Sequence, residues 1–292
     1  MLRPLRRSII RLTPPAVVVA IALGMALAGC SASPEPAASH TTPVASRTPQ
    51  AITAAQFSQR LAAYERKHDI RIWVDAIDTG NDHHLGFRAT ETVPIDMLSF
   101  TASVLVLANA SDDQLAASPA ASETGVETGT PATLLDAVSA ALQTNAPQAE
   151  QTLVTWLGGD DAFRRRAGEL LEQQGAGPSA RSFAALLDNA VYGETLAPDR
   201  RGTLRNILLN SPESPATAAG TDAPWEVAGV SDTSQAGSLA EVSTLEVPYR
   251  ASGDAAPVVL ALVVTGAPDV ETANRAAQEV SRLVTHVLPP TR

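Results

Sequence analysis

The chain has 292 residues, 45% of them hydrophobic, and a formal net charge of −10, which predicts an acidic globular protein. Nucleic-acid binding needs a basic surface, so we expect no nucleic-acid partner. Cys30 is the only cysteine. It excludes an intramolecular disulfide and a cysteine-based metal site, and we expect no metal and no other cofactor.

Residues 1–29 have the pattern of a secretory signal peptide. Four arginines and no acid precede an apolar run over residues 16–26, which is too short to span a bilayer. The run leads into Leu27-Ala28-Gly29-Cys30, which resembles the lipobox of bacterial lipoproteins. This resemblance implies cleavage before Cys30 and its modification with lipid, palmitate included. It places the protein at the outer face of the cytoplasmic membrane.

A linker and one folded domain are predicted after Cys30. Residues 30–51 are rich in Ser, Ala, Thr and Pro, a composition that cannot bury enough apolar surface to fold. Residues 52–289 form the predicted domain, with a helical subdomain over about 97–212.

Hydrophobic periodicity predicts helices and strands through the whole domain, with residues 112–130 as a loop. In chain order the segments are a helix over 53–67, strands over 70–76 and 85–88, helices over 99–109, 132–142, 147–157, 160–173, 180–191 and 198–209, strands over 225–230, 239–247 and 258–264, and a helix over 270–287. This order predicts an α/β fold of the α+β type. Its five-stranded antiparallel sheet is flanked by N- and C-terminal helices and carries an inserted all-helical subdomain.

Four phrases occur in the order typical of one enzyme family. They are Ala76-Ile77-Asp78-Thr79-Gly80, Leu157-Gly158-Gly159, Gly193-Glu194-Thr195-Leu196-Ala197-Pro198 and Trp225-Glu226-Val227. Together they resemble class A β-lactamases and the related penicillin-recognising serine hydrolases, over nearly the whole predicted domain. The resemblance implies a β-lactamase-like fold with a serine three residues before a lysine, an S-D-N loop, a K-T-G strand and an Ω-loop glutamate.

The nucleophile and its lysine are missing from the expected positions. Counting from Pro94, the two positions fall on Met97 and Phe100, and a register that uses Ser99 as nucleophile replaces the lysine with alanine. Lys67 is the only lysine of the chain and ends the first predicted helix. Arginine cannot replace a lysine base, because its guanidinium stays protonated.

The other motifs of the family are also altered. The S-D-N position falls on Gln143-Thr144-Asn145 and the K-T-G position on Val230-Ser231-Asp232. Asp232 would repel the carboxylate of a β-lactam. Only residues 174–179 remain for the Ω-loop between two predicted helices, which leaves no room for its glutamate.

Two further patterns are interpreted as surface features. His83 and His84 are adjacent, so they cannot chelate one ion together, and we expect both in a solvated turn. Arg164-Arg165-Arg166 lies among acidic residues at helical spacing, which favours a solvated, ion-paired face over a docking patch.

The sequence therefore predicts a pseudoenzyme without catalytic residues, with a binding or scaffolding role at the cell envelope. The expected partners are the membrane, through the lipid on Cys30, and a cell-wall fragment or an envelope protein. Two alternatives stay open, a serine hydrolase with a rearranged active site and a small-ligand-binding lipoprotein. The predicted binding cleft consists of Met97, Ser99, Phe100, Asn145, Ser231 and Asp232.

Overall fold

The computed structural model describes residues 52–95, 97–118, 131–175, 177–211, 215–221, 225–233, 236–246 and 256–288. The predicted signal peptide, Cys30 and the predicted linker all lie outside these residues. The chain divides between Thr48 and Pro49, and every described residue belongs to the second part. Among these residues, no helix is both long enough and apolar enough to cross a membrane.

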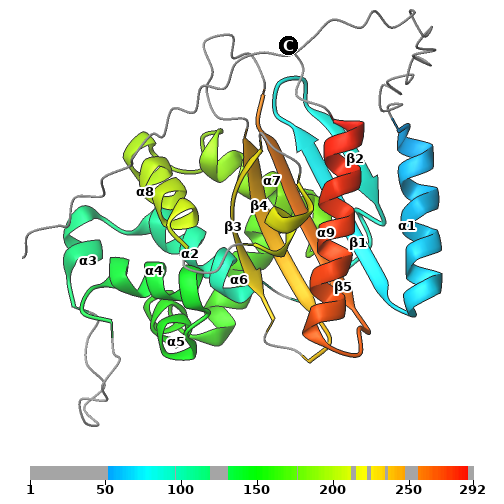
Figure 1. The fold of residues 1–292 in the computed structure, drawn as a ribbon. Coiled ribbons are helices and arrows are strands. Elements are labelled where there is room, and N and C mark those ends of the chain that lie inside the picture. Colours follow the sequence, from blue (N-terminus) through cyan, green and yellow to red (C-terminus); the bar gives the residue numbers. More distant parts are fainter. Residues whose placement is uncertain are drawn as a thin grey trace, which may run out of the picture. The chain divides into compact units, whose positions relative to one another are not determined.

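Five antiparallel strands form a sheet with the spatial order β2-β1-β5-β4-β3 (Figure 1). The strands are β1 (Arg71–Asp78), β2 (His83–Phe87), β3 (Glu226–Asp232), β4 (Leu239–Glu246) and β5 (Val258–Thr265). β1 and β5 come from opposite ends of the domain and pair along their whole length. The predicted five-stranded antiparallel sheet is confirmed.

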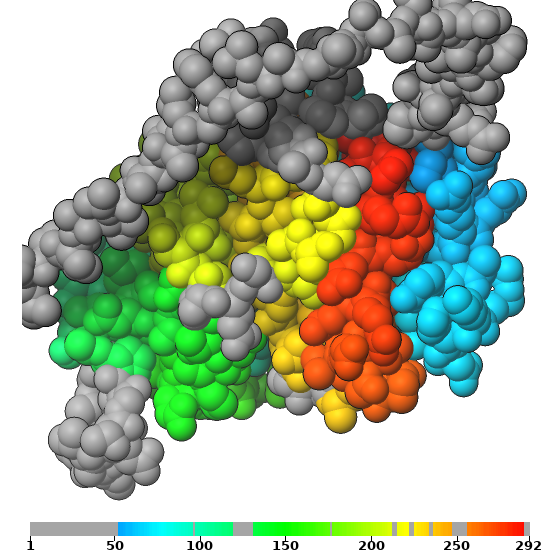
Figure 2. Space-filling model, viewed as in Figure 1, coloured from blue at the N-terminus to red at the C-terminus, as the bar shows by residue number. Residues whose placement is uncertain are grey.

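One face of the sheet is covered by the terminal helices α1 (Ala54–His68) and α9 (Val270–Val287) and by the short 3-10 helix η1 (Ala216–Gly220). α9 lies between α1 and η1 (Figure 2). Phe57 of α1 and Val280 of α9 are fully buried there because both helices turn an apolar stripe toward the strands.

The helical subdomain and α7 cover the other face, so the sheet separates two hydrophobic cores. α7 packs directly on β1 and β5, and it lies behind the sheet in Figure 1. The helices are α2 (Leu98–Asn109), α3 (Asp112–Ala116), α4 (Leu134–Thr144), α5 (Pro147–Trp156), α6 (Asp160–Gln173), α7 (Ala180–Val191) and α8 (Pro198–Leu209).

The predicted loop over residues 112–130 is wrong at its start, where α3 forms. Ser111 caps this helix in a capping box with Gln114, and Leu115 is buried. η1 was not predicted either. Both segments are five residues long, which is too short for hydrophobic periodicity to show.

His83 and His84 are both exposed, as predicted, but they lie on β2 instead of in a turn, and His84 makes a contact that was not predicted. Its Nδ1 lies 2.7 Å from Oδ2 of Asp75, and this carboxylate is fully buried on β1. The guanidinium of Arg181 on α7 approaches the same carboxylate at 3.5 Å. Burial raises the pKa of Asp75, while His84 and Arg181 oppose the rise. His84 lies on β2 next to β1, so the hairpin brings the two side chains together.

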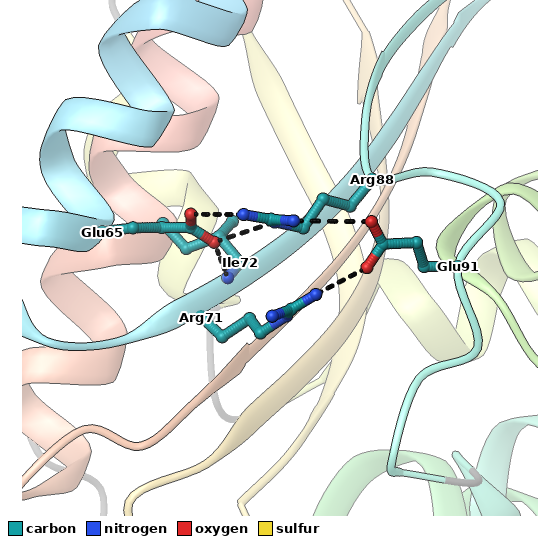
Figure 3. Close-up of polar contacts among 5 residues, drawn as sticks. All are labelled: Glu65, Arg71, Ile72, Arg88 and Glu91. Carbon is teal, nitrogen blue, oxygen red and sulfur yellow. Dashed lines mark hydrogen bonds and ion pairs between the residues drawn. The ribbon is translucent and has the colours of Figure 1, made fainter.

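A network of ion pairs ties α1 to the hairpin (Figure 3). The carboxylate of Glu65 accepts hydrogen bonds from the backbone N–H of Ile72 at 2.8 Å and from the guanidinium of Arg88 at 3.0 Å. Glu91 lies between Arg88 and Arg71 and pairs with both, at 3.4 and 2.7 Å. Glu65 is buried, so Arg88 neutralises a charge that would otherwise be costly.

Candidate functional site

The first turn of α2 carries three of the predicted cleft residues. Met97 is the N-cap, with a left-handed backbone at φ 43° and no side-chain capping bond. Met97, Ser99 and Phe100 are only 2%, 3% and 1% exposed. The side chains of Met97 and Phe100 belong to the core of the helical subdomain. The structure therefore fills the expected nucleophile and lysine positions with buried apolar groups.

Ser99 donates its hydroxyl hydrogen to the carboxylate of Glu150 in the first turn of α5. Burial raises the pKa of Glu150, the negative charge of Asp232 raises it further, and the Ser99 hydrogen bond opposes the rise. This arrangement brings α2, α5 and the end of β3 together. The sequence did not identify Glu150 as a site residue. The one feature that could have indicated it is its place as an acidic residue in the first turn of the predicted helix after Asn145.

Asn145 connects the helical subdomain to the sheet. It ends α4 in the left-handed conformation at φ 47°, and its Nδ2 donates to the backbone carbonyl of Ser231 at 2.5 Å. Its Oδ1 is buried and accepts no hydrogen bond from the described residues. A buried acceptor without a donor is costly, so Asn145 is the residue here most in need of a further partner.

Ser231 and Asp232 follow one another on β3, so their side chains lie on opposite faces of the sheet. Asp232 acts electrostatically on Glu150. The hydroxyl of Ser231 instead donates to Oε2 of Glu241 on β4 at 3.1 Å, because the two residues are direct cross-strand partners. The predicted cleft residues thus divide between the two faces of the strand.

Glu241 is fully buried beneath Ser231 and was not predicted. Its carboxylate also accepts hydrogen bonds from the backbone and the hydroxyl of Thr217 in η1. Burial raises the pKa of Glu241 to about 7, although the bonds from Thr217 and Ser231 oppose the rise. The only sequence signal was an acidic residue inside a strand whose other charged residue, Glu246, stands at its end.

A cavity of about 110 Å³ lies beside Asn145 and Ser231. Its other lining residues are Leu142, Gln143, Ser211, Ala216, Thr233, Leu239 and Asn274. These side chains are hydroxyl, amide or apolar groups, so the cavity suits a small uncharged polar ligand. Met97, Ser99 and Phe100 do not line it.

The site offers no coordination sphere for a metal. Among the described residues, no three or more His, Cys, Asp or Glu side chains are grouped so that they could hold an ion. Ser99, Glu150 and Asp232 instead form a cluster of one hydroxyl and two carboxylates.

The structure is similar to solved β-lactamases. A halotolerant bacterial β-lactamase matches with a TM-score of 0.66 and 24% identity, over 78% of this chain and 98% of that chain. A β-lactamase from Burkholderia ambifaria matches with a TM-score of 0.65 and 24% identity, over 80% and 100%. A class A β-lactamase from Clostridium kluyveri DSM 555 matches with a TM-score of 0.63 and 19% identity, over 79% and 99%.

These matches confirm the predicted fold, that of the class A β-lactamases, over nearly the whole length of the solved proteins. No protein-family model and no curated protein sequence matches the chain.

Proposed function

We propose that this β-lactamase-like domain is non-catalytic and serves as a binding or scaffolding component of the cell envelope, tethered by lipid on Cys30. One observation carries the proposal. Met97 and Phe100 occupy the positions where the motif count places the nucleophile and the lysine, and both side chains are closed into the core. A catalytic serine and lysine must reach the substrate, and these groups have neither the chemistry nor the exposure.

The position of the only lysine supports the same conclusion. Lys67 is exposed in the last turn of α1, which packs on the face of the sheet opposite to the helical subdomain. The groups that surround Ser99 are the carboxylates of Glu150 and Asp232. They would repel the carboxylate of a β-lactam and leave its developing negative charge without a cation.

A polar, uncharged ligand fits the surface better than a β-lactam does. The cavity beside Asn145 and Ser231 presents amides and hydroxyls. The Oδ1 of Asn145 is buried beside the cavity and accepts no hydrogen bond from the described residues. A cell-wall fragment supplies matching hydroxyl and amide groups, and an envelope protein supplies backbone amides.

The purified mature chain tests the proposal with nitrocefin and with a fluorescent penicillin. We expect no burst of nitrocefin hydrolysis and no covalent labelling, because Ser99 is 3% exposed. Labelling that disappears in Ser99→Ala and persists in Ser58→Ala, a half-buried serine on α1 outside the candidate site, would show that the domain is an enzyme.

The bond between Ser99 and Glu150 favours one second candidate, a serine hydrolase with a rearranged site. In this candidate Glu150 accepts the Ser99 proton while Oγ attacks an acyl carbon. A fluorophosphonate probe discriminates between the two. Labelling that requires both Ser99 and Glu150 supports the hydrolase, whereas a folded, unlabelled protein supports the binding domain.

A further inference from the structure

A second, larger hollow lies in the helical subdomain, away from the candidate site. This groove has a volume of about 730 Å³ and is formed by α2, α3, α5 and α6. Its lining residues are Leu105, Asn109, Gln114, Trp156, Arg166, Glu169, Leu170 and Gln173. None of them belongs to the cluster around Ser99. Leu105 is the groove residue on α2 that is nearest to Ser99 in sequence, and it lies six positions further on, about 9 Å along the helix axis.

Among the described residues that line the groove, Trp156 supplies the one aromatic surface. It is the last residue of α5, and it packs against the core of the helical subdomain while staying partly exposed. An indole held in this way is rigid and amphipathic, with an apolar face for stacking and an N–H for hydrogen bonding. A sugar ring, which has an apolar face of C–H groups, matches such a surface.

Arg166 and Glu169 contribute a cation and an anion from α6. Both side chains are exposed, and neither makes an ion pair or hydrogen bond within the described part of the chain. Arg164, Arg165 and Arg166 are all exposed, as predicted for a solvated face, but none of them forms an ion pair with a described residue. The guanidinium of Arg166 is free to bind a carboxylate with two parallel hydrogen bonds. The carboxylate of Glu169 is free to accept from hydroxyl groups.

Three carboxamides complete the lining. Asn109 uses its Nδ2 to donate to the Leu105 carbonyl at 2.7 Å, which leaves its Oδ1 available as an acceptor. Gln114 uses its Oε1 to accept from the backbone of Ser111 at 2.9 Å, which leaves its Nε2 available as a donor. Gln173 adds a third amide. A ligand rich in hydroxyls can pair with acceptors and donors that alternate in this way.

We propose that this groove is a binding site for an oligosaccharide that carries a carboxylate. Its volume lies within the roughly 300–1,000 Å³ range of small-molecule sites. An apolar ligand would leave the amides and both charges unpaired at a cost, and a phosphate-rich ligand would meet Glu169 with only one arginine to offset it. A sugar acid can interact with every polar or aromatic side chain of the groove. The ring stacks on Trp156, the hydroxyls pair with the amides and Glu169, and the acid group pairs with Arg166.

Two matched pairs of disaccharides test the proposal by calorimetric titration of the mature chain. In the first pair, N-acetylglucosaminyl-N-acetylmuramic acid is compared with di-N-acetylchitobiose. In the second, cellobiouronic acid is compared with cellobiose. We expect at least one acid to bind with a Kd below about 1 mM and its neutral match to bind about tenfold more weakly, because it lacks the charge-assisted bonds.

Variants of residues on α5 and α6 test whether the sugars bind in this groove. Arg166→Gln should weaken the acid about tenfold and leave the neutral disaccharide unchanged. Arg165→Gln removes the same charge from a neighbouring residue outside the groove and should change neither. Trp156→Ala should abolish both. If Trp156→Ala lowers the Tm, Trp156→Phe keeps the packing and should weaken both sugars several-fold.

Three results would overturn the proposal. The first is the absence of binding of either acid at about 10 mM, roughly ten times the weakest Kd expected. The second is binding that Arg166→Gln and Arg165→Gln weaken equally, which indicates only a response to net charge. The third is tighter binding of an acidic dipeptide such as Ala-Glu than of both acid disaccharides, which would make the groove a peptide site.

Discussion

Ser99 donates its hydroxyl hydrogen to the Glu150 carboxylate, and this bond joins the first turn of α2 to the first turn of α5. The negative charge of Asp232 on β3 acts on the same carboxylate. A serine, a glutamate and an aspartate from three segments far apart in the sequence therefore lie close together. The only lysine of the chain, Lys67, lies elsewhere, on α1. The pair is a packing element in our interpretation, and its contribution to stability can be measured.

Ser99→Ala should lower the free energy of unfolding by about 2 kcal/mol at pH 7.5, because a partly buried carboxylate loses a charge-assisted donor. The loss should shrink to about 1 kcal/mol at pH 4, where a larger fraction of Glu150 is protonated and the bond is neutral. Urea unfolding at the two pH values checks this. Ser58→Ala is the control and should behave nearly like the wild type, because Ser58 is only half-buried and its hydroxyl bonds only to the Ala54 carbonyl of its own helix.

Glu241 should make the protein less stable as the pH rises. Its pKa increases from the ordinary 4.5 to about 7 on folding, so its stabilisation is fully present below about pH 4.5 and is lost as the pH rises through about 7. Compared with the wild type, Glu241→Gln should gain about 3 kcal/mol between pH 4.5 and pH 8. Chemical denaturation across this range measures the difference. Glu226→Gln, an exposed carboxylate on β3, should show no such gain.

Arg88 should contribute more to the free energy of unfolding than Arg71, although both arginines pair with Glu91 (Figure 3). Arg88→Met leaves buried Glu65 with the Ile72 N–H as its remaining donor, and should cost about 2 kcal/mol. Arg71→Met removes a pair in which both side chains are about half exposed, and should change stability little. Equal losses in thermal unfolding would contradict this assignment.

Gly220 lies where η1 meets α9 and has no space for a side chain. A Cβ there would lie 2.0 Å from the backbone oxygen of Gln278 and 2.3 Å from Oγ of Ser281. Gly220→Ala should therefore destabilise by about 2 kcal/mol through overpacking. Gly168 lies inside α6 with nothing within 4 Å of its Cβ position, so Gly168→Ala should stabilise by about 0.5–1 kcal/mol. Opposite shifts in Tm are the expected outcome.

Cys30 lies outside the described residues, and its lipidation remains a prediction from the lipobox pattern. Cys30→Ser should abolish incorporation of labelled palmitate and move the protein out of the membrane fraction of the bacterial host. Ser33→Ala, which changes a nearby serine of the predicted linker, should leave both unchanged. Membrane association that survives Cys30→Ser would rule out the anchor.

The sequence alone determined the long helices and the five strands of the sheet, because these elements are strongly periodic, whereas the five-residue α3 and η1 were missed. α9 shows the 3.6-residue repeat of a helix packed on one side, and β1 shows the alternation and turn of a hairpin strand. The sequence also showed that Met97 and Phe100 stand where a serine and a lysine were expected, because such motifs are read by counting along the chain.

Only the tertiary structure decided which polar groups meet. Glu150 lies 51 residues from Ser99, and Glu241 lies 24 residues from Thr217, and no local pattern links such pairs. The buried state of Asp75 also depends on α7, whose Arg181 arrives from far along the chain. Contacts of this kind depend on how helices dock onto the sheet, and the docking buries these charged groups and thereby sets their pKa values.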